Sequence, residues 1–275
     1  MLMEATEEKL SRRNFLKSAT TLATGLAVGG VVGSGLFAGG CASNGATKTA
    51  VAAKWPWPYQ KLDPEVVRKK GYEGYYEGAC MYGAVRALVS ELSAKVGDPY
   101  SSLPIDMFRY GEGGMAGWGS LCGALNGSCA VLNLASDKNT YPKLVTELLN
   151  FYTTNSFPSK KHDAYAKFPG QVQSVSGSTL CHVSIANWCK VSGKKALSPE
   201  RADRCAKLAG DVAAHAAELL NKVADGTFAA AYTIPPAVQT CRGCHAKGGT
   251  LGNIRGKENC EQCHDLNYKA HHPSF

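Results

Sequence analysis

Several features are scarce or absent in this 275-residue chain, and each absence excludes a class of protein. Charged residues make up 19% and hydrophobic residues 44% of the chain, which favours neither a disordered protein nor one with many membrane spans. The formal net charge is +8, yet no basic patch interleaved with aromatic residues is present, so nucleic-acid binding is not expected. No convincing alternating strand pattern appears, and we therefore expect a mainly α fold.

The N-terminal part of the chain carries an export pattern. A Ser-Arg-Arg-Asn-Phe-Leu-Lys motif at residues 11–17 precedes an apolar, glycine-rich run at 20–37. This arrangement resembles a twin-arginine signal, which carries folded proteins across the bacterial inner membrane, so it predicts a periplasmic location. The run is short for a membrane span, and we expect the leader, residues 1–41, to be cleaved rather than to remain as a transmembrane anchor.

The residues after the apolar run allow two further interpretations. Cys41 follows small residues and is a candidate for a lipid anchor, although Ala38 stands where a larger aliphatic residue is usual. Residues 42–59 are small and polar and end in Trp55-Pro-Trp-Pro-Tyr59, where the prolines favour extended backbone. We expect a linker that is either an aromatic latch onto the following domain or a plain tether.

Two motifs near the C-terminus match the pattern for covalent haem attachment. They are Cys241-Arg-Gly-Cys244-His245 and Cys260-Glu-Gln-Cys263-His264. In this chemistry two thiols, separated by two residues, bind the vinyl groups of the porphyrin, and the next histidine donates a nitrogen to iron. The sequence therefore predicts two haem c groups, with His245 and His264 as axial ligands.

Zinc is the rival interpretation of the same cysteines. Fifteen residues separate Cys244 from Cys260, which also suits a zinc ribbon, but zinc does not require a histidine after each pair. Fourteen residues lie between His245 and Cys260, too few for a separate haem domain. We expect both haems to share a small, loop-rich dihaem segment at 231–275, with the rings close together.

The sixth ligand of each haem iron is open. His271 and His272 follow the second motif and are the preferred donors, unless they are exposed tail residues. No methionine lies near the motifs, so we expect two histidines per iron, which suits electron transfer rather than catalysis at iron. The other histidines are alternatives, of which the first is expected in a solvated loop: His162, His182 and His215.

Residues 60–230 are predicted to form a helical domain. Asp63-Pro64 and Ser198-Pro199 are typical of helix starts, and apolar residues recur at helical spacing after each. In the second of these helices Cys205 falls on the apolar stripe and is expected to face inward. Residues 121–134 and 141–152 are expected to form two more helices.

This domain contains six cysteines of which no two form a CxxC pair: Cys80, Cys122, Cys129, Cys181, Cys189 and Cys205. A glycine-rich stretch at 111–119 precedes the second of them, and glycine allows backbone amides to approach a bound group closely. Amides directed at cysteine sulfurs tune iron–sulfur clusters. Taken by themselves, the spacings fit buried core thiols equally well.

The order and context of these cysteines resemble the C_GCAxxG_C_C redox family. The landmarks are Cys80, the glycine-rich run into Cys122-Gly-Ala-Leu-Asn-Gly127, Cys181 and Cys205. Joined to the two haem motifs, the pattern is similar to that of the split-Soret cytochromes c, over roughly residues 60–270. The resemblance implies a homodimer with two stacked haems and a [2Fe–2S] centre in each subunit, and an axial haem ligand from the neighbouring subunit.

The same resemblance supplies candidate ligands for the iron–sulfur centre. It carries over to Cys80, Cys122, Cys181 and Cys205, and leaves Cys129 outside the pattern. Cys189, eight residues after Cys181, is an alternative ligand in place of one of the four. The fold that we expect is therefore a helical iron–sulfur domain followed by the dihaem segment.

Electron transfer between periplasmic redox partners is the function that these features favour, rather than an enzymatic reaction. A twin-arginine signal fits this interpretation, because a cluster assembled in the cytoplasm would have to be folded into the protein before export. The alternatives are a multicofactor reductase with an open haem or cluster as substrate site, and a redox sensor. No output domain supports the sensor, and no group of acid–base residues near 241–264 supports the reductase.

Overall fold

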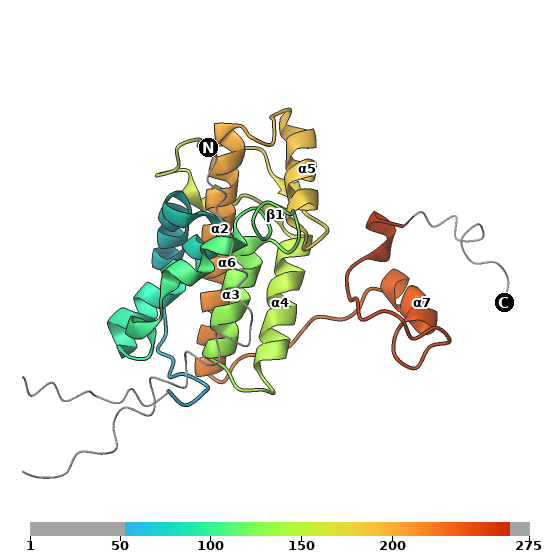
Figure 1. Ribbon diagram of the computed structural model, residues 1–275, viewed down its shortest axis with the longest axis horizontal. Coiled ribbons are helices and arrows are strands. Elements are labelled where there is room, and N and C mark those ends of the chain that lie inside the picture. The colour runs from blue at the N-terminus through green and yellow to red at the C-terminus, as the bar shows by residue number, and fades with distance from the viewer. Residues whose placement is uncertain (1–52, 265–275) are drawn as a thin grey trace, which may run out of the picture. The chain divides into compact units, whose positions relative to one another are not determined.

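The computed structural model of the protein describes residues 53–264 (Figure 1). The predicted leader, most of the linker, and the candidate ligands His271 and His272 lie outside the described residues. The described chain is mostly helical, which confirms the expected mainly α fold. Its helices are α2 (Pro64–Val96), η1 (Tyr100–Ser102), η2 (Ile105–Gly111), α3 (Gly123–Leu134), α4 (Tyr141–Thr154), η3 (Lys160–His162), α5 (Cys181–Ser192), α6 (Pro199–Ala224), α7 (Pro236–His245) and η4 (Cys260–Gln262).

The centre of the fold is the pair of α2 and α6, and the part of α2 before residue 78 runs antiparallel to α6, since Leu62 bonds to Asn221 and Tyr72 to Asp203 (Figure 1). Both helices begin where the sequence predicts. The Asp63 side chain accepts a hydrogen bond from the Glu65 amide at 2.8 Å, and Ser198 caps α6 in the same way. The two backbones nearly touch: a Cβ on Gly71 would lie 2.8 Å from the Gly210 Cα. Glycine at this crossing therefore allows close packing of the two helices.

Helices α3 and α4 complete the core around this pair. α3 packs against α2, α4 and α6, and its buried residues include Leu125 and Leu132. Two strands of two residues each, β1 (Ser156–Phe157) and β2 (Ser174–Val175), pair antiparallel after α4. Strands of two residues are too short to show an alternating pattern of apolar and polar residues, so the sequence did not reveal them. Within residues 53–264 no helix has the length and apolar character needed to cross a membrane.

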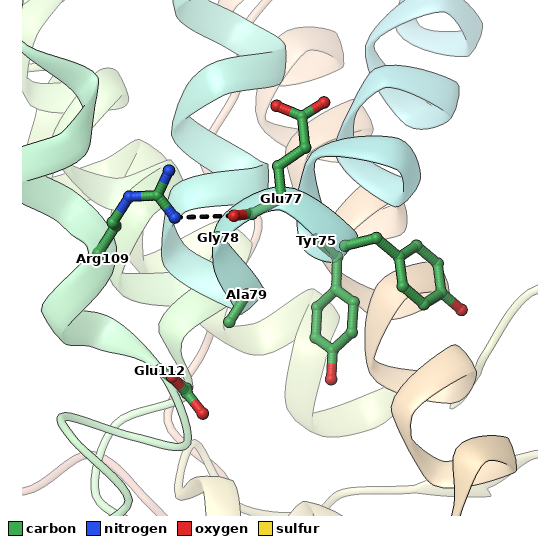
Figure 2. A pocket seen from close by; sticks show the side chains of 7 residues that line it. Tyr75, Glu77, Gly78, Ala79, Arg109 and Glu112 are labelled. Carbon is green, nitrogen blue, oxygen red and sulfur yellow. Dashed lines mark hydrogen bonds between the residues drawn. The ribbon is translucent and has the colours of Figure 1, made fainter.

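α2 is interrupted in its middle, which the sequence did not indicate. Ala79 has a φ of 63°, a value that L side chains seldom adopt, and Gly78 also departs from helical geometry. Arg109 stabilises the break, since its Nη1 donates to the Glu77 carbonyl at 2.7 Å (Figure 2). The break directs the next residue, Cys80, into the interior.

The aromatic end of the linker is attached to the helical domain. Trp55 donates from Nε1 to the Asn133 carbonyl at 2.6 Å, and the Trp57 amide donates to Leu134 at 2.7 Å. Tyr59 donates to Asn221 on α6 at 2.7 Å. Of the two interpretations of this segment, the latch is confirmed.

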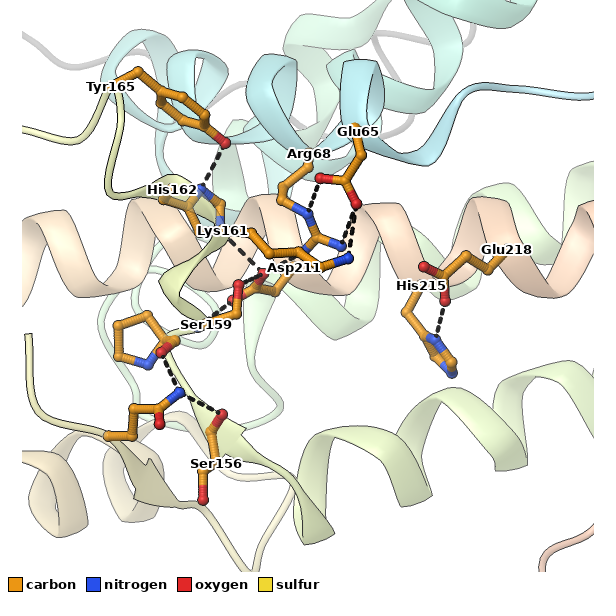
Figure 3. Close-up of polar contacts among 12 residues, drawn as sticks. Glu65, Arg68, Ser156, Ser159, Lys161, His162, Tyr165, Asp211, His215 and Glu218 are labelled. Carbon is orange, nitrogen blue, oxygen red and sulfur yellow. Dashed lines mark hydrogen bonds and ion pairs between the residues drawn. The ribbon is translucent and has the colours of Figure 1, made fainter. Parts of the chain in front are cut away.

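A buried polar network between α2 and α6 contradicts one expectation. His162 was expected in a solvated loop, but it is fully buried, with its Nε2 3.0 Å from Asp211 Oδ1 (Figure 3). Asp211 also forms an ion pair with Arg68 and accepts from Ser159. The prediction was wrong because the partner of this histidine, Asp211, is supplied by a distant helix.

His215 also has structural contacts. It stacks on Phe151 with 3.8 Å between ring centroids, and its Nδ1 lies 2.9 Å from Glu218 Oε2. Both contacts give this histidine a structural role. His182 binds the Gly119 carbonyl through Nδ1 at 2.9 Å.

Candidate functional site

Four cysteines from four different elements meet in the interior. Cys80 follows the break in α2, Cys122 precedes α3, Cys181 begins α5, and Cys205 lies in the second turn of α6. Their exposed fractions are only 7%, 3%, 6% and 5%, respectively. Burial raises the pKa of the Cys80 thiol well above its usual value, and the other three thiols raise it further. The four side chains therefore share one buried site.

The elements that carry these cysteines are joined by backbone hydrogen bonds. The Cys122 amide donates to the Thr179 carbonyl at 3.0 Å, and the Cys181 amide donates to Ser120 at 2.7 Å. Leu121 and Leu180 form an antiparallel bridge between the two donors. The segments before α3 and α5 are thus held side by side, which fixes two of the cysteines relative to each other.

The glycine-rich loop lies against this site. Gly113 directs a backbone hydrogen bond to Cys80, and the amides of Ala124 and Leu125 do the same for Cys122. Gly114 has a φ of 70°, and a Cβ there would lie 2.9 Å from the Cys181 Cβ. Amides that point at sulfur stabilise thiolates and metal-bound sulfur.

A buried cation lies beside the cysteines. Arg204 Nη1 is 3.9 Å from Cys205 Sγ, and its Nη2 donates to Ser184 at 2.8 Å. Burial lowers the pKa of this guanidinium, but Cys205, Tyr152 and Cys122 together outweigh that effect, and the net pKa is raised. Within residues 53–264 Arg204 forms no ion pair with a carboxylate, and its buried Nε has no hydrogen-bond partner. The site is therefore electrostatically prepared for negative charge.

An iron–sulfur cluster fits this donor set. Thiolate ligands select iron–sulfur clusters and zinc, and the amides and the unpartnered Arg204 Nε point to a negatively charged sulfur-rich group. In the described part of the chain, no group of three or more His, Cys, Asp or Glu side chains is arranged to hold a single metal ion. The fit therefore depends on the donor chemistry and the charge of the site rather than on a preformed single-ion geometry.

The two remaining cysteines of the domain are separate from the four. Cys189 lies eight residues after Cys181 on the same helix, which corresponds to about 12 Å along its axis. Cys129 is on α3, and burial alone raises its pKa to about 12. The structure thus brings together the four cysteines of the family pattern and does not bring Cys189 to them.

A cavity of about 400 Å³ adjoins the site on the α2 side (Figure 2). Among the residues that line it are Glu77, Ala79 and Glu112. Tyr75 lines the cavity and also interacts with Cys205 and Cys80. The cavity is lined by the residues of the break in α2, Gly78 and Ala79, and no sequence pattern predicts it.

The two haem motifs also lie close together. The first occupies the end of α7, and the second begins at η4. Burial raises the pKa of the Cys260 thiol, and Cys241 raises it further through charge and a hydrogen bond. The first cysteines of the two motifs are therefore neighbours, as expected for closely spaced haems.

Around these neighbours the remaining motif residues are accessible. Cys244, Cys263 and His264 are exposed. His245 Nδ1 lies 2.9 Å from Asn253 Oδ1, the kind of partner that orients a ligating imidazole. Asn253 lies between the two motifs in the sequence, and no other sequence feature identifies it as a partner of His245.

Comparisons with known proteins agree with this arrangement. Residues 80–219 match the family model described as "Putative redox-active protein (C_GCAxxG_C_C)". The split-Soret cytochrome c of Desulfovibrio desulfuricans is 34% identical over 221 residues, which are 78% of this chain and 79% of that protein. A solved structure of split-Soret cytochrome c from that species, described as having a novel iron centre, matches with a TM-score of 0.71 over 76% of this chain and 90% of its own. By sequence and by structure, this chain belongs to the split-Soret cytochrome c family.

Proposed function

We propose that the protein is a periplasmic dihaem cytochrome with a [2Fe–2S] centre, which passes electrons between redox partners. The observation that carries the proposal is the meeting of Cys80, Cys122, Cys181 and Cys205 beside the buried Arg204. A core of plain packing thiols would not require a buried guanidinium without a carboxylate partner, since desolvating a cation is costly.

The four cysteines would hold the cluster, and the residues around them would tune it. Four thiolates carry four negative charges, and Arg204 offsets one of them inside the protein. The amides of Gly113, Ala124 and Leu125 donate to the sulfur atoms, which favours the more negative, reduced state. When bound, such a cluster accepts and releases single electrons.

Two haem c groups would be bound covalently by the C-terminal motifs. Cys241 and Cys244 would hold the first and Cys260 and Cys263 the second, with His245 and His264 as axial ligands. His271 and His272 remain the preferred sixth ligands. The contact between Cys241 and Cys260 supports closely spaced rings.

The location and the partners belong to the same proposal. Export by the twin-arginine route would place the protein in the periplasm, with a lipid anchor through Cys41 as an option. We expect a homodimer and one or more redox partner proteins. Nucleic acid is not among the expected partners.

A periplasmic reductase is the second candidate, and the cavity in Figure 2 is the observation that favours it. It is lined by Ala79, the residue before Cys80, and by two carboxylates, Glu77 and Glu112, that would serve as acid–base groups. A small oxidised substrate that accelerates reoxidation of the reduced protein, and loses this effect in Glu112→Gln, would support it. Absence of any such acceleration with a panel of small oxidants would leave electron transfer between proteins.

The test is a series of single Cys→Ser variants purified anaerobically with haem and iron quantified. We expect iron in excess of haem in the unaltered protein and its loss in the Cys80, Cys122, Cys181 and Cys205 variants. Cys129→Ser and Cys189→Ser are matched controls that should retain the iron, because these thiols lie outside the site. Iron equal to haem in the unaltered protein, or full iron in all four site variants, would remove the cluster from the proposal.

A further inference from the structure

The second haem motif touches the loop that precedes Cys181. The Thr179 amide donates a hydrogen bond to Glu258 Oε1 at 2.5 Å. Glu258 lies two residues before Cys260, and Thr179 lies two residues before Cys181. One hydrogen bond to a charged acceptor, which is the stronger kind, therefore joins the haem segment to the cysteine site.

Thr179 is itself part of the cysteine site. Its carbonyl accepts from the Cys122 amide at 3.0 Å, while its own amide is bound to Glu258. The neighbouring Leu180 amide donates to Ser178 Oγ at 3.1 Å, and Gly177 donates to Thr153 at 3.0 Å. The loop at 176–180 is thus held in one conformation by bonds on both sides.

A second contact joins the same two segments. Gly177 has a φ of 67°, and a Cβ added there would lie 2.1 Å from Gln262 Nε2. Gln262 is one of the two residues between Cys260 and Cys263. The positive φ favours glycine at this position, and the end of the Gln262 side chain lies directly against it, so the loop and the second haem motif are in contact.

The haem segment is also attached to α4. Glu147 accepts hydrogen bonds from the Ala231 and Tyr232 amides at 2.6 and 2.7 Å. Lys257, next to Glu258, donates to Thr146 at 3.3 Å. These contacts limit where the segment can lie, but Glu258 is the charged group that reaches the cysteine site.

We propose that Glu258 is a positioning residue that fixes the second haem motif against the loop carrying Cys181. The backbone of Thr179 then connects the two sites: its amide donates to Glu258 and its carbonyl accepts from the Cys122 amide. The rate of electron exchange between the cluster and the haem depends on the distance between them, and the Glu258 hydrogen bond holds that distance constant. This inference deepens the proposed function and rests on it.

The test compares Glu258→Ala with Glu261→Ala in the full haem-loaded protein. Both variants remove one carboxylate beside Cys260, but only Glu258 bonds to the helical domain, whereas Glu261 is exposed. Hydrogen exchange in the 176–180 loop should be about tenfold faster in Glu258→Ala and unchanged in Glu261→Ala. Electron exchange between cluster and haem, followed after rapid partial reduction, should slow in the same variant alone.

Glu258→Gln is the rescue variant, because its amide oxygen can still accept from Thr179. It should restore most of the protection of the loop and most of the electron-exchange rate. It also serves as the test variant if the alanine variant fails to bind haem. Hydrogen exchange in the 176–180 loop should then be somewhat faster than in the unaltered protein, by less than the tenfold expected for alanine.

Unchanged loop exchange in both Glu258 variants would overturn the inference. Equal slowing of electron exchange in Glu258→Ala and Glu261→Ala would also overturn it, because charge alone would then explain the effect. Failure of the proposed function has a different signature: iron equal to haem in the unaltered protein. The comparison of loop exchange between Glu258→Ala and Glu261→Ala is made in the same cluster state, so it reports on Glu258 whether or not the cluster is present.

Discussion

Replacing Asp211 with asparagine should destabilise the protein strongly. The Asp211 carboxylate is buried between Arg68, His162 and Ser159 (Figure 3), and asparagine keeps its shape but removes its charge. Arg68, itself buried, would keep only the partly exposed Glu65 as partner. Removing one member of a buried ion pair costs about 3–5 kcal/mol, because the other charge stays buried.

The assay is thermal unfolding of the full protein, followed by far-UV circular dichroism. For a domain of this size, 1 kcal/mol corresponds to about 2–4 °C, so we expect the Tm of Asp211→Asn to fall by about 6–20 °C. Asp225→Asn is the matched control: it breaks the Lys61 ion pair of 2.7 Å, in which both side chains are largely exposed. Such a pair contributes about 0–1 kcal/mol. A Tm for Asp211→Asn within about 2 °C of the control would refute the reasoning.

The same carboxylate predicts a pH dependence. Burial raises the pKa of Asp211, but the hydrogen bond from His162 and the Arg68 charge outweigh burial, so the net pKa lies below its ordinary value. A lowered pKa stabilises the folded state above the unfolded value of about 3.9, and this contribution is lost as pH falls through the folded pKa. Urea unfolding should therefore show a gap between unaltered protein and Asp211→Asn at pH 7 that narrows towards pH 3. A gap that widens on acidification would contradict this assignment.

Three further predictions concern the cofactor sites. Gly114→Ala should lower the iron content and destabilise the fold more than Gly117→Ala. Both glycines have positive φ, but only a Cβ on Gly114 would meet other atoms, the nearest being the Ser120 amide nitrogen at 2.7 Å. Equal effects of the two variants would contradict the packing argument. Arg204→Met should lose iron relative to haem while Arg204→Lys retains more, because the site needs a buried cation; equal iron in both would contradict it. Asn253→Ala should weaken the orientation of His245 and increase the high-spin haem fraction in the optical spectrum, and an unchanged spectrum would mean that this contact does not orient the ligand.

The helix starts were predictable because their causes are local. Asp63 and Ser198 each precede a proline and cap the helix with their own side chains, and nothing distant is needed. α5 was missed for the corresponding reason: its first residue follows Leu180, whose side chain makes no capping hydrogen bond. The end of that helix at Gly193, in the left-handed conformation, was the signal that could have revealed it.

The interruption of α2 depends on distant contacts, so the sequence could not show it. An alanine at φ 63° has no local preference for that conformation, and the donor to the Glu77 carbonyl comes from Arg109, 32 residues later. The burial of His162 has the same kind of cause, since Asp211 is 49 residues away. In each case the decisive partner belongs to another helix.

The candidate site was predictable in part. The four cysteines could be chosen from their order and contexts, but their meeting in space depends on how α2 packs against α6. The sequence allowed Cys189 as an alternative cluster ligand, but α5 places it about two helical turns from Cys181. Arg204 and Glu258 could not be chosen at all, because an arginine before a cysteine and a glutamate in a polar segment are common on exposed surfaces.

The glycine contact between α2 and α6 has a mechanical consequence for the cysteine site. Cys205 lies five residues before Gly210 on α6, and Cys80, which follows the break in α2, interacts with it. The separation in α6 corresponds to a lever arm of about 8 Å, so a rotation of about 10° at the contact would displace Cys205 by about 1 Å. Two backbones without intervening side chains resist such rotation, and the distance between these two sulfur atoms should change little when the charge of the site changes.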